Sequence, residues 1–249
     1  MTDSLLIEHL TDAAWPAEVR ERVGPWVLRA TRGVTRRANS VMSAGSVVSG
    51  GEMKTLVSAA EAWYAARSLP AAFQISTQSP AGLDEVLAGR GYTVSGASEV
   101  WVAEVNGVRE MARRGEEVEL EESPTHEWFD CAFDEPAEKR AIHEEIVRRV
   151  PMPRIFAGVA GDGLVAGCGM AAIDPAARWA GIYCMATRPG YRRMGIARKI
   201  LAAIAKRASH LGVRWLYLQV MNENAAARAL YGGLGFESAF GYHYRIKSG

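Results

Sequence analysis

Two arginines and a glycine in the segment 192–197 are the residues best suited to bind a charged group. A run rich in β-forming residues (181–187) precedes this segment, and Pro189 and Gly190 form a turn between the two. Apolar residues at helical spacing follow it as far as Leu211. The segment is therefore expected to be a strand-to-helix loop. Its free backbone N–H groups and its guanidinium groups would bind phosphate.

A glycine-rich turn before a helix is also compatible with an ordinary tight turn. No Gly-Lys-Ser/Thr follows, so the loop is not a P-loop, and it lacks the Gly-x-Gly-x-x-Gly of a dinucleotide site. A second segment makes the phosphate interpretation stronger. Residues 224–236 follow a strand-like run at 215–220, and they carry Asn224, Tyr231 and the pair Gly235-Phe236 in a helical pattern.

Together, the two segments resemble the GNAT superfamily of acyl-CoA-dependent N-acyltransferases. The first matches the superfamily's Arg/Gln-x-x-Gly-x-Gly/Ala pyrophosphate loop, with Arg192, Gly195 and Ala197 at the defining positions. The second matches the helix that ends in Tyr and is followed by Gly-Phe. The resemblance covers about the last third of the chain and implies an acetyl-CoA-dependent N-acetyltransferase.

Composition narrows the remaining function classes. The chain has 249 residues, of which 49% are hydrophobic and 23% charged, as in ordinary soluble proteins. A formal net charge of +1 gives no reason to expect nucleic acid or a membrane surface as partner. Three cysteines without C-x-x-C spacing argue against a disulfide framework or a zinc site, and no metal is expected. We find no signal peptide or membrane-spanning run, and expect a cytoplasmic protein.

The chain also repeats itself. Gly91-Tyr92 and Gly235-Phe236 lie 144 positions apart, and Gly51 and Gly195 have the same separation. An ungapped register across loop, helix, strand, helix and Gly-aromatic corner predicts two copies of one fold. The alternative is that any two α/β segments can be aligned in this way. We expect a degenerate GNAT-like N-terminal domain at 1–108 and a catalytic GNAT domain at 116–249.

The first copy lacks the groups that would bind phosphate. It has no arginines opposite 192–197, and Glu52 stands at its helix start, where it would repel a phosphate. Leu87, which has no proton to give, stands opposite Tyr231, and Pro80 stands opposite Asn224. The whole chain thus resembles tandem GNAT proteins with a degenerate N-terminal copy. One CoA per chain is expected.

We expect an α/β (α+β) protein, with two GNAT-like mixed, mostly antiparallel sheets flanked by helices. In the second half, a junction at 106–123 ends in a first strand near 118–121. Helices at 125–133 and 136–149 follow, and then strands at 154–159, 164–172 and 179–187, a helix at 197–211, a strand at 215–220 and the helix with Tyr231.

The resemblance implies particular roles. The phenol of Tyr231 is expected to be the general acid that protonates the leaving thiolate. No general base is named, because Glu121, Glu122, Glu144 and Glu145 border the acceptor region but are equally typical of solvated faces. Cys184 is expected to be a structural thiol. The residues expected to bind the cofactor are Met185, Thr187, Arg192, Arg193, Met194, Gly195, Ile196, Ala197 and Asn224.

Two functions stay open from the sequence. The first is transfer of an acetyl group from acetyl-CoA to a primary amine by direct attack in a ternary complex. The second is a catalytically inactive, CoA-binding regulatory or scaffolding protein. Tyr231 and the intact loop favour the first. The missing base and Gly232-Gly233, which weaken the helix after Tyr231, are compatible with the second. The acceptor would be a small-molecule or peptide amine, since GNAT proteins accept both kinds.

Overall fold

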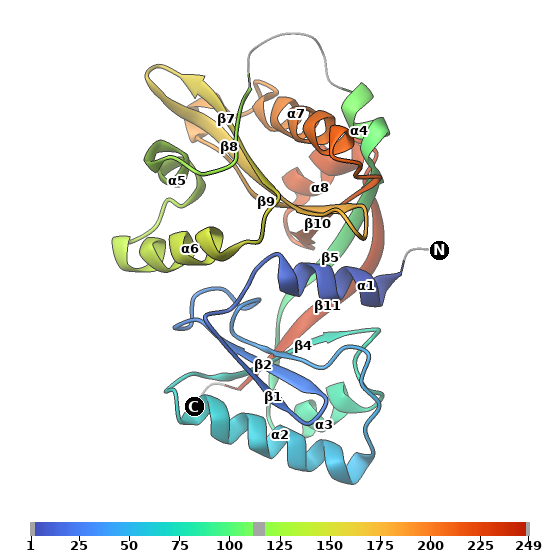
Figure 1. Cartoon of the computed structure of the whole chain (residues 1–249). Coiled ribbons are helices and arrows are strands. Elements are labelled where there is room, and N and C mark those ends of the chain that lie inside the picture. The colour runs from blue at the N-terminus through green and yellow to red at the C-terminus, as the bar shows by residue number, and fades with distance from the viewer. Residues whose placement is uncertain (1–2, 112–117, 248–249) are drawn as a thin grey trace. The chain divides into compact units, whose positions relative to one another are not determined.

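Figure 1 shows the computed structural model, which describes residues 3–111 and 118–247. Its contacts divide the chain into two units. The first contains the residues up to Glu99 together with those from Ala239 onward, and the second is Val100–Ser238. This division differs from the expected domains, because 100–108 belongs to the second unit and the last strand of the chain belongs to the first.

The first unit is a sheet with the strand order β1-β2-β3-β4-β11-β5. Strand β11 pairs with β4 in antiparallel register, Tyr242 opposite Ser76, whereas β3 and β4 are parallel. Trp26, Tyr64 and Phe73 are fully buried in its core. Its elements are α1 (Ser4–Ala13), β1 (Val19–Val23), β2 (Trp26–Ala30), β3 (Val41–Met42), α2 (Gly50–Ala65), β4 (Ala71–Ser76), α3 (Leu83–Gly89), β5 (Thr93–Glu104) and β11 (Glu237–Lys247).

The second unit has the strand order β5-β10-β9-β8-β7-β6, and it begins with the last residues of β5. Strands β6 to β9 are antiparallel, while β9 and β10 are parallel. Its further elements are α4 (Val105–Glu110), β6 (Glu119–Glu121), α5 (His126–Ala132), α6 (Ala137–Arg149), β7 (Arg154–Gly161), β8 (Leu164–Asp174), β9 (Trp179–Thr187), the short 3₁₀ turn η1 (Pro189–Tyr191), α7 (Ile196–His210), β10 (Trp215–Met221) and α8 (Ala225–Gly232).

Helix α7 packs closely on β8 and β9 because the strands present small residues to it. A Cβ atom added at Gly167 of β8 would lie 2.4 Å from Cγ2 of Ile196. Apolar residues recur on the buried face of α7, from Ile196 through Ile200 and Ile204 to Ala208. This face and the strands beneath it form the core of the second unit. The packing fixes the end of α7 at which the phosphate loop stands.

The mixed, mostly antiparallel sheet flanked by helices confirms the expected fold class. The repeat also appears in the elements, since β4 and β10 begin at Ala71 and Trp215, and β5 and β11 at Thr93 and Glu237. Each pair is 144 positions apart, as the sequence predicts. One element differs: part of the expected junction is the helix α4, which buries Val105 and Val108.

Within residues 3–111 and 118–247, no helix is long and apolar enough to cross a bilayer. The same residues contain no group of three or more His, Cys, Asp or Glu side chains arranged to hold a metal ion.

Candidate active site

A bulge in β9 opens the sheet beside the site. The register between β8 and β9 shifts, so that Cys168 lies opposite Ala186 but Met170 lies opposite Tyr183. Cys184 inside this bulge has a φ of 53°, a left-handed conformation that β-strand residues rarely adopt. The parallel ladder between β9 and β10 ends at Ile182 and Leu218, although both strands continue. Beyond Ile182, β9 therefore has no ladder partner on β10 among the residues that the structure describes.

The loop after η1 leaves the start of α7 open. Gly195 precedes the helix with a φ of 80°, and Arg193 has a φ of 63°. No side chain caps α7, so its first backbone N–H groups point out of the helix without an intrahelical partner. A Cβ atom at Gly195 would meet nothing within 4 Å. Glycine is therefore needed here for its backbone conformation and for the open space above it, not for packing.

The last residues of β9 (185–187), the loop before α7 and helix α8 surround one cavity of about 810 Å³. Four arginines line it, and two of them are tied to backbone carbonyls by their Nε atoms. Arg188 donates to Val165 over 2.9 Å, and Arg192 donates to Thr187 over 3.3 Å. The charge and the open helix start suit an anionic ligand. The four are Arg188, Arg192, Arg193 and Arg198.

Tyr231 lines the same cavity from the last turn of α8. Helix α8 continues through Gly232, so the two glycines do not end it before the tyrosine. The ring packs against Phe236, and only 8% of the residue is exposed. Burial raises the pKa of the phenol to about 12. None of the described residues forms a hydrogen bond with its hydroxyl, which leaves that group available to a molecule in the cavity.

Eight of the ten residues expected at the site line this one cavity. Met194 does not, since its side chain is exposed to 62% of its area. Asn224 does not either. Its side chain caps α8 by accepting a hydrogen bond of 3.1 Å from the N–H of Ala227. The eight that line the cavity are Met185, Thr187, Arg192, Arg193, Gly195, Ile196, Ala197 and Tyr231.

Sequence reasoning missed the wall that α5 contributes. Asp130 and Cys131 line the cavity, and Asp134 follows them just after the helix. Asp130 forms an ion pair with Arg140, which lowers the pKa of its carboxyl. A hydrogen bond with the thiol of Cys168 lowers the pKa of Cys131. No local pattern marks these residues, because α5 reaches the cavity only through its packing on β8 and β9.

The acidic residues considered as bases lie elsewhere. Glu144 forms ion pairs with Arg140 and Arg148, and Glu145 lies 3.7 Å from Arg149. Neither these two residues nor Glu121 and Glu122, which are exposed in and after β6, line the cavity. Cys184 does not line it either, and its carbonyl accepts a contact of 3.7 Å from the thiol of Cys168.

Comparison with known proteins identifies the family of the chain. The sequence profile of the family described as "Probable histone acetyltransferase Rv0428c C-terminal" matches residues 4–245, almost the whole chain. The chain belongs to this acetyltransferase family. It is also 30% identical over 254 residues to the uncharacterized N-acetyltransferase YobR of Bacillus subtilis, with 99% of this chain and 100% of YobR covered. Both findings put it in the GNAT superfamily.

Shorter and more distant likenesses are also with N-acetyltransferases or GNAT proteins. A segment of 58 residues, 23% of this chain, is 40% identical to 39% of the [Ribosomal protein bS18]-alanine N-acetyltransferase of Escherichia coli. A GCN5-related N-acetyltransferase from Kribbella flavida superposes with a TM-score of 0.75 at 16% identity, over 100% of this chain and 97% of that one. A tandem GNAT protein from the clavulanic acid biosynthesis pathway superposes with a TM-score of 0.65 at 13% identity, over 97% and 87%. The last two likenesses concern the fold alone.

Proposed function

We propose that this acetyltransferase moves an acetyl group from acetyl-CoA directly to a primary amine, with both substrates bound at once. The observation that carries the proposal is the hydroxyl of Tyr231. The residue is largely buried, it lines the same cavity as the open start of α7, and no described protein group bonds to its hydroxyl. That hydroxyl is therefore available to a molecule bound in the cavity.

The cavity fits the chemistry of CoA. The uncapped N–H groups of α7 and the guanidinium groups of Arg192 and Arg193 would hold its diphosphate. The backbone of β9 from Met185 to Thr187, beyond the end of its ladder with β10, would hydrogen-bond the amide groups of its pantetheine arm. When bound, acetyl-CoA supplies the acetyl group as a reactive thioester.

Tyr231 would supply the proton that the departing sulfur needs. With a pKa of about 12, its phenol stays protonated at neutral pH. A free thiol has a pKa of about 8.5, which by itself would make the transfer unfavourable. Desolvation beside Tyr231 would raise the pKa of the thiol as well and so make this proton transfer less unfavourable.

Amine deprotonation needs no side chain in this scheme. Asp130 is held by Arg140, and no other carboxylate except Asp134 lines the described cavity. Part of the amine is already neutral in solution, and water would take up the proton of the ammonium form. We propose a small-molecule or peptide amine as the acceptor.

Release of free CoA thiol tests this function. The full-length protein is incubated with acetyl-CoA and a panel of polyamines, amino acids, aminoglycosides and N-terminal peptides, and the thiol is measured with DTNB. We expect at least one amine to give turnover that Tyr231→Phe reduces strongly. Thermal stabilisation by acetyl-CoA without turnover on any amine would instead support the inactive, CoA-binding alternative.

A further inference from the structure

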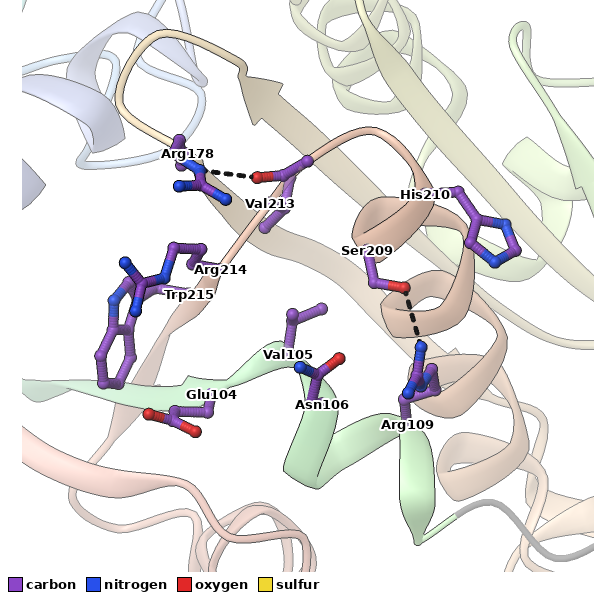
Figure 2. Close-up of a pocket in the computed structure, with 11 residues that line it drawn as sticks. Glu104, Val105, Asn106, Arg109, Arg178, Ser209, His210, Val213, Arg214 and Trp215 are labelled. Atoms are coloured by element: carbon purple, nitrogen blue, oxygen red, sulfur yellow. Dashed lines mark hydrogen bonds between the residues drawn. The ribbon is translucent and has the colours of Figure 1, made fainter.

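A second, strongly basic groove lies in the second unit, at the end of the sheet away from the cofactor cavity (Figure 2). Its volume is about 370 Å³. Helix α7 begins at the cofactor cavity with Ile196 and ends at this groove with His210, which separates the two by roughly 20 Å at 1.5 Å per residue. Strand β9 likewise runs from the groove end to the cavity end. The groove is therefore a distinct site on the same elements.

Three arginines from three separate segments line the groove. Figure 2 shows Arg178 and Arg214 on one side and Arg109 on the other, with Val105 and Val213 between them. Both valines are buried, with 3% of each exposed, and form the apolar floor. Glu104 is the single acidic side chain in the lining. The groove thus carries three guanidinium groups against one carboxylate, which is a net positive charge.

These arginines have few bonds within the protein. Arg214 donates no side-chain hydrogen bond to any residue that the structure describes, and none of the three forms an ion pair there. Arg178 uses only its Nε, on the carbonyl of Gly212 at 3.0 Å, and Arg109 reaches Ser209 at 3.5 Å. Some exposed arginines elsewhere in the chain are paired, as Arg20 is with Asp12. Most of the donors in the groove are left for a ligand.

Backbone hydrogen bonds fix the segments that carry these side chains. The N–H of Arg214 donates to the carbonyl of Arg178 over 2.8 Å, and the N–H of Val105 donates to the carbonyl of Arg214 over 2.9 Å. The three arginine positions are thereby held in a constant arrangement before anything binds. Such preorganisation lowers the entropy cost of binding.

We infer that this groove binds a small organic anion with at least two phosphate or carboxylate groups. Guanidinium groups bind both kinds of oxyanion through paired N–H donors, and a volume of about 370 Å³ lies within the range of small-molecule sites. Glu104 would repel a ligand that is anionic along its whole length. The ligand therefore carries a hydroxyl or amino group next to its anionic groups, and that group lies beside Glu104.

Isothermal titration of the full-length protein tests the inference, with fructose 1,6-bisphosphate and citrate as separate probes, both of which carry hydroxyl groups beside their anionic groups. Saturating CoA is present throughout, so that the loop at Gly195 is occupied. We expect one of the probes to bind once per chain, which also distinguishes a phosphate from a carboxylate preference. Arg214→Gln, which removes one unit of charge, should weaken that binding at least about tenfold, the loss expected for charge-assisted hydrogen bonds.

Arg207→Gln is the matched control. Arg207 is exposed on α7 and lies outside the groove, and its substitution removes one unit of charge, as the substitution of Arg214 does. We expect it to change the affinity less than about twofold, as long-range charge effects are screened by salt. Unchanged melting temperature and CoA affinity show that the variants are folded. Failure of both probes to bind, equal loss in Arg207→Gln, or binding seen only in a parallel titration without CoA would each overturn the inference. Binding of an acidic peptide, titrated as a third probe, without binding of either small anion would also overturn it.

Discussion

Helices α2 and α7 hold corresponding places in the two halves of the chain but begin differently. The hydroxyl of Ser49 caps α2 by accepting a bond of 3.4 Å from the N–H of Glu52, and Glu52 adds a negative charge to its first turn. Gly195 leaves α7 uncapped, and arginines precede it. In α2 a side chain of the protein bonds to a free N–H group at the helix start, which stabilises the fold. In α7 the same groups are left for a ligand.

Helices α3 and α8, which also correspond in the two halves, differ in the same sense. Leu87 of α3 is fully buried, whereas Tyr231 of α8, 144 positions later, presents a hydroxyl to a cavity. The aromatic corner that follows is kept in both, as Tyr92 and as Phe236. Packing positions are thus retained in both halves, and the groups that would do chemistry occur in one.

The largest effect is expected where the two loops differ. Gly195→Glu should weaken acetyl-CoA binding at least about 100-fold, because a carboxylate there repels the diphosphate and removes charge-assisted hydrogen bonds. Gly51→Glu is the matched control, since Gly51 is exposed, has open space around it and stands at the corresponding position. We expect no change in affinity from that variant. Calorimetric titration measures both, and unchanged binding in Gly195→Glu would refute the placement of the cofactor.

Next in size is the effect of removing the phenolic hydroxyl. Tyr231→Phe should lower kcat by about 10²–10⁴, the usual contribution of a general acid, with the KM for acetyl-CoA changed little. Because burial raises the pKa of Tyr231 to about 12, its ionisation should cause no loss of activity below about pH 11. Steady-state kinetics across pH measures both effects.

Tyr92→Phe provides the matched control in the other half. It removes a hydroxyl that bonds to Glu61 over 3.1 Å, in the unit without an arginine loop. We expect its kcat to equal that of the wild type. If Tyr231→Phe keeps full kcat, Tyr231 is not the acid, whatever the control shows.

The sequence predicts the local parts of the site well. The loop around Gly195 and the helix with Tyr231 have strong patterns, because turn residues and helical periodicity are encoded over a few positions. The positions of Asp130 and Cys131 could not be predicted, since α5 meets the cavity only through tertiary packing. Asn224 shows the limit of motif reasoning. A helix cap and a cofactor contact favour the same residue type, and the structure gives it the cap.

The sequence also does not predict that the last strand of the chain belongs to the first unit. A strand pattern by itself does not determine which sheet the strand joins. Side chains of the first unit select it instead: Arg245 bonds to both carboxylate oxygens of Asp84, at 2.7 and 3.0 Å, and His243 adds a third bond. Such pairing between residues more than 150 positions apart has no local signature.

This clamp gives the third prediction, on stability. Bonds from Arg245 and His243 lower the pKa of Asp84 to about 2, from an ordinary value of 3.8. The stabilisation is therefore complete above about pH 4 and is lost as the pH falls toward 2. Asp84→Asn should lower the melting temperature at pH 7 by no more than about 4 °C, because Asp84 is partly exposed and solvent screens the pair. The difference from the wild type should vanish near pH 2, and scanning calorimetry across pH would show whether it does.

The smallest effect is expected at the corresponding place in the second unit. Arg228 occupies the position of Asp84, and its guanidinium lies 5.1 Å from the centre of the ring of Trp101, which occupies the position of Arg245. A cation–π contact stands where the first unit has its carboxylate clamp, and such contacts are worth about 0.5–1 kcal/mol at exposed sites. For this contact we expect Arg228→Gln to lower the free energy of unfolding by about that amount, equally at pH 3 and pH 7, because a cation–π contact involves no carboxylate. Urea titrations at the two pH values measure the loss. A loss that grew between them would mean that Arg228 acts mainly through a carboxylate.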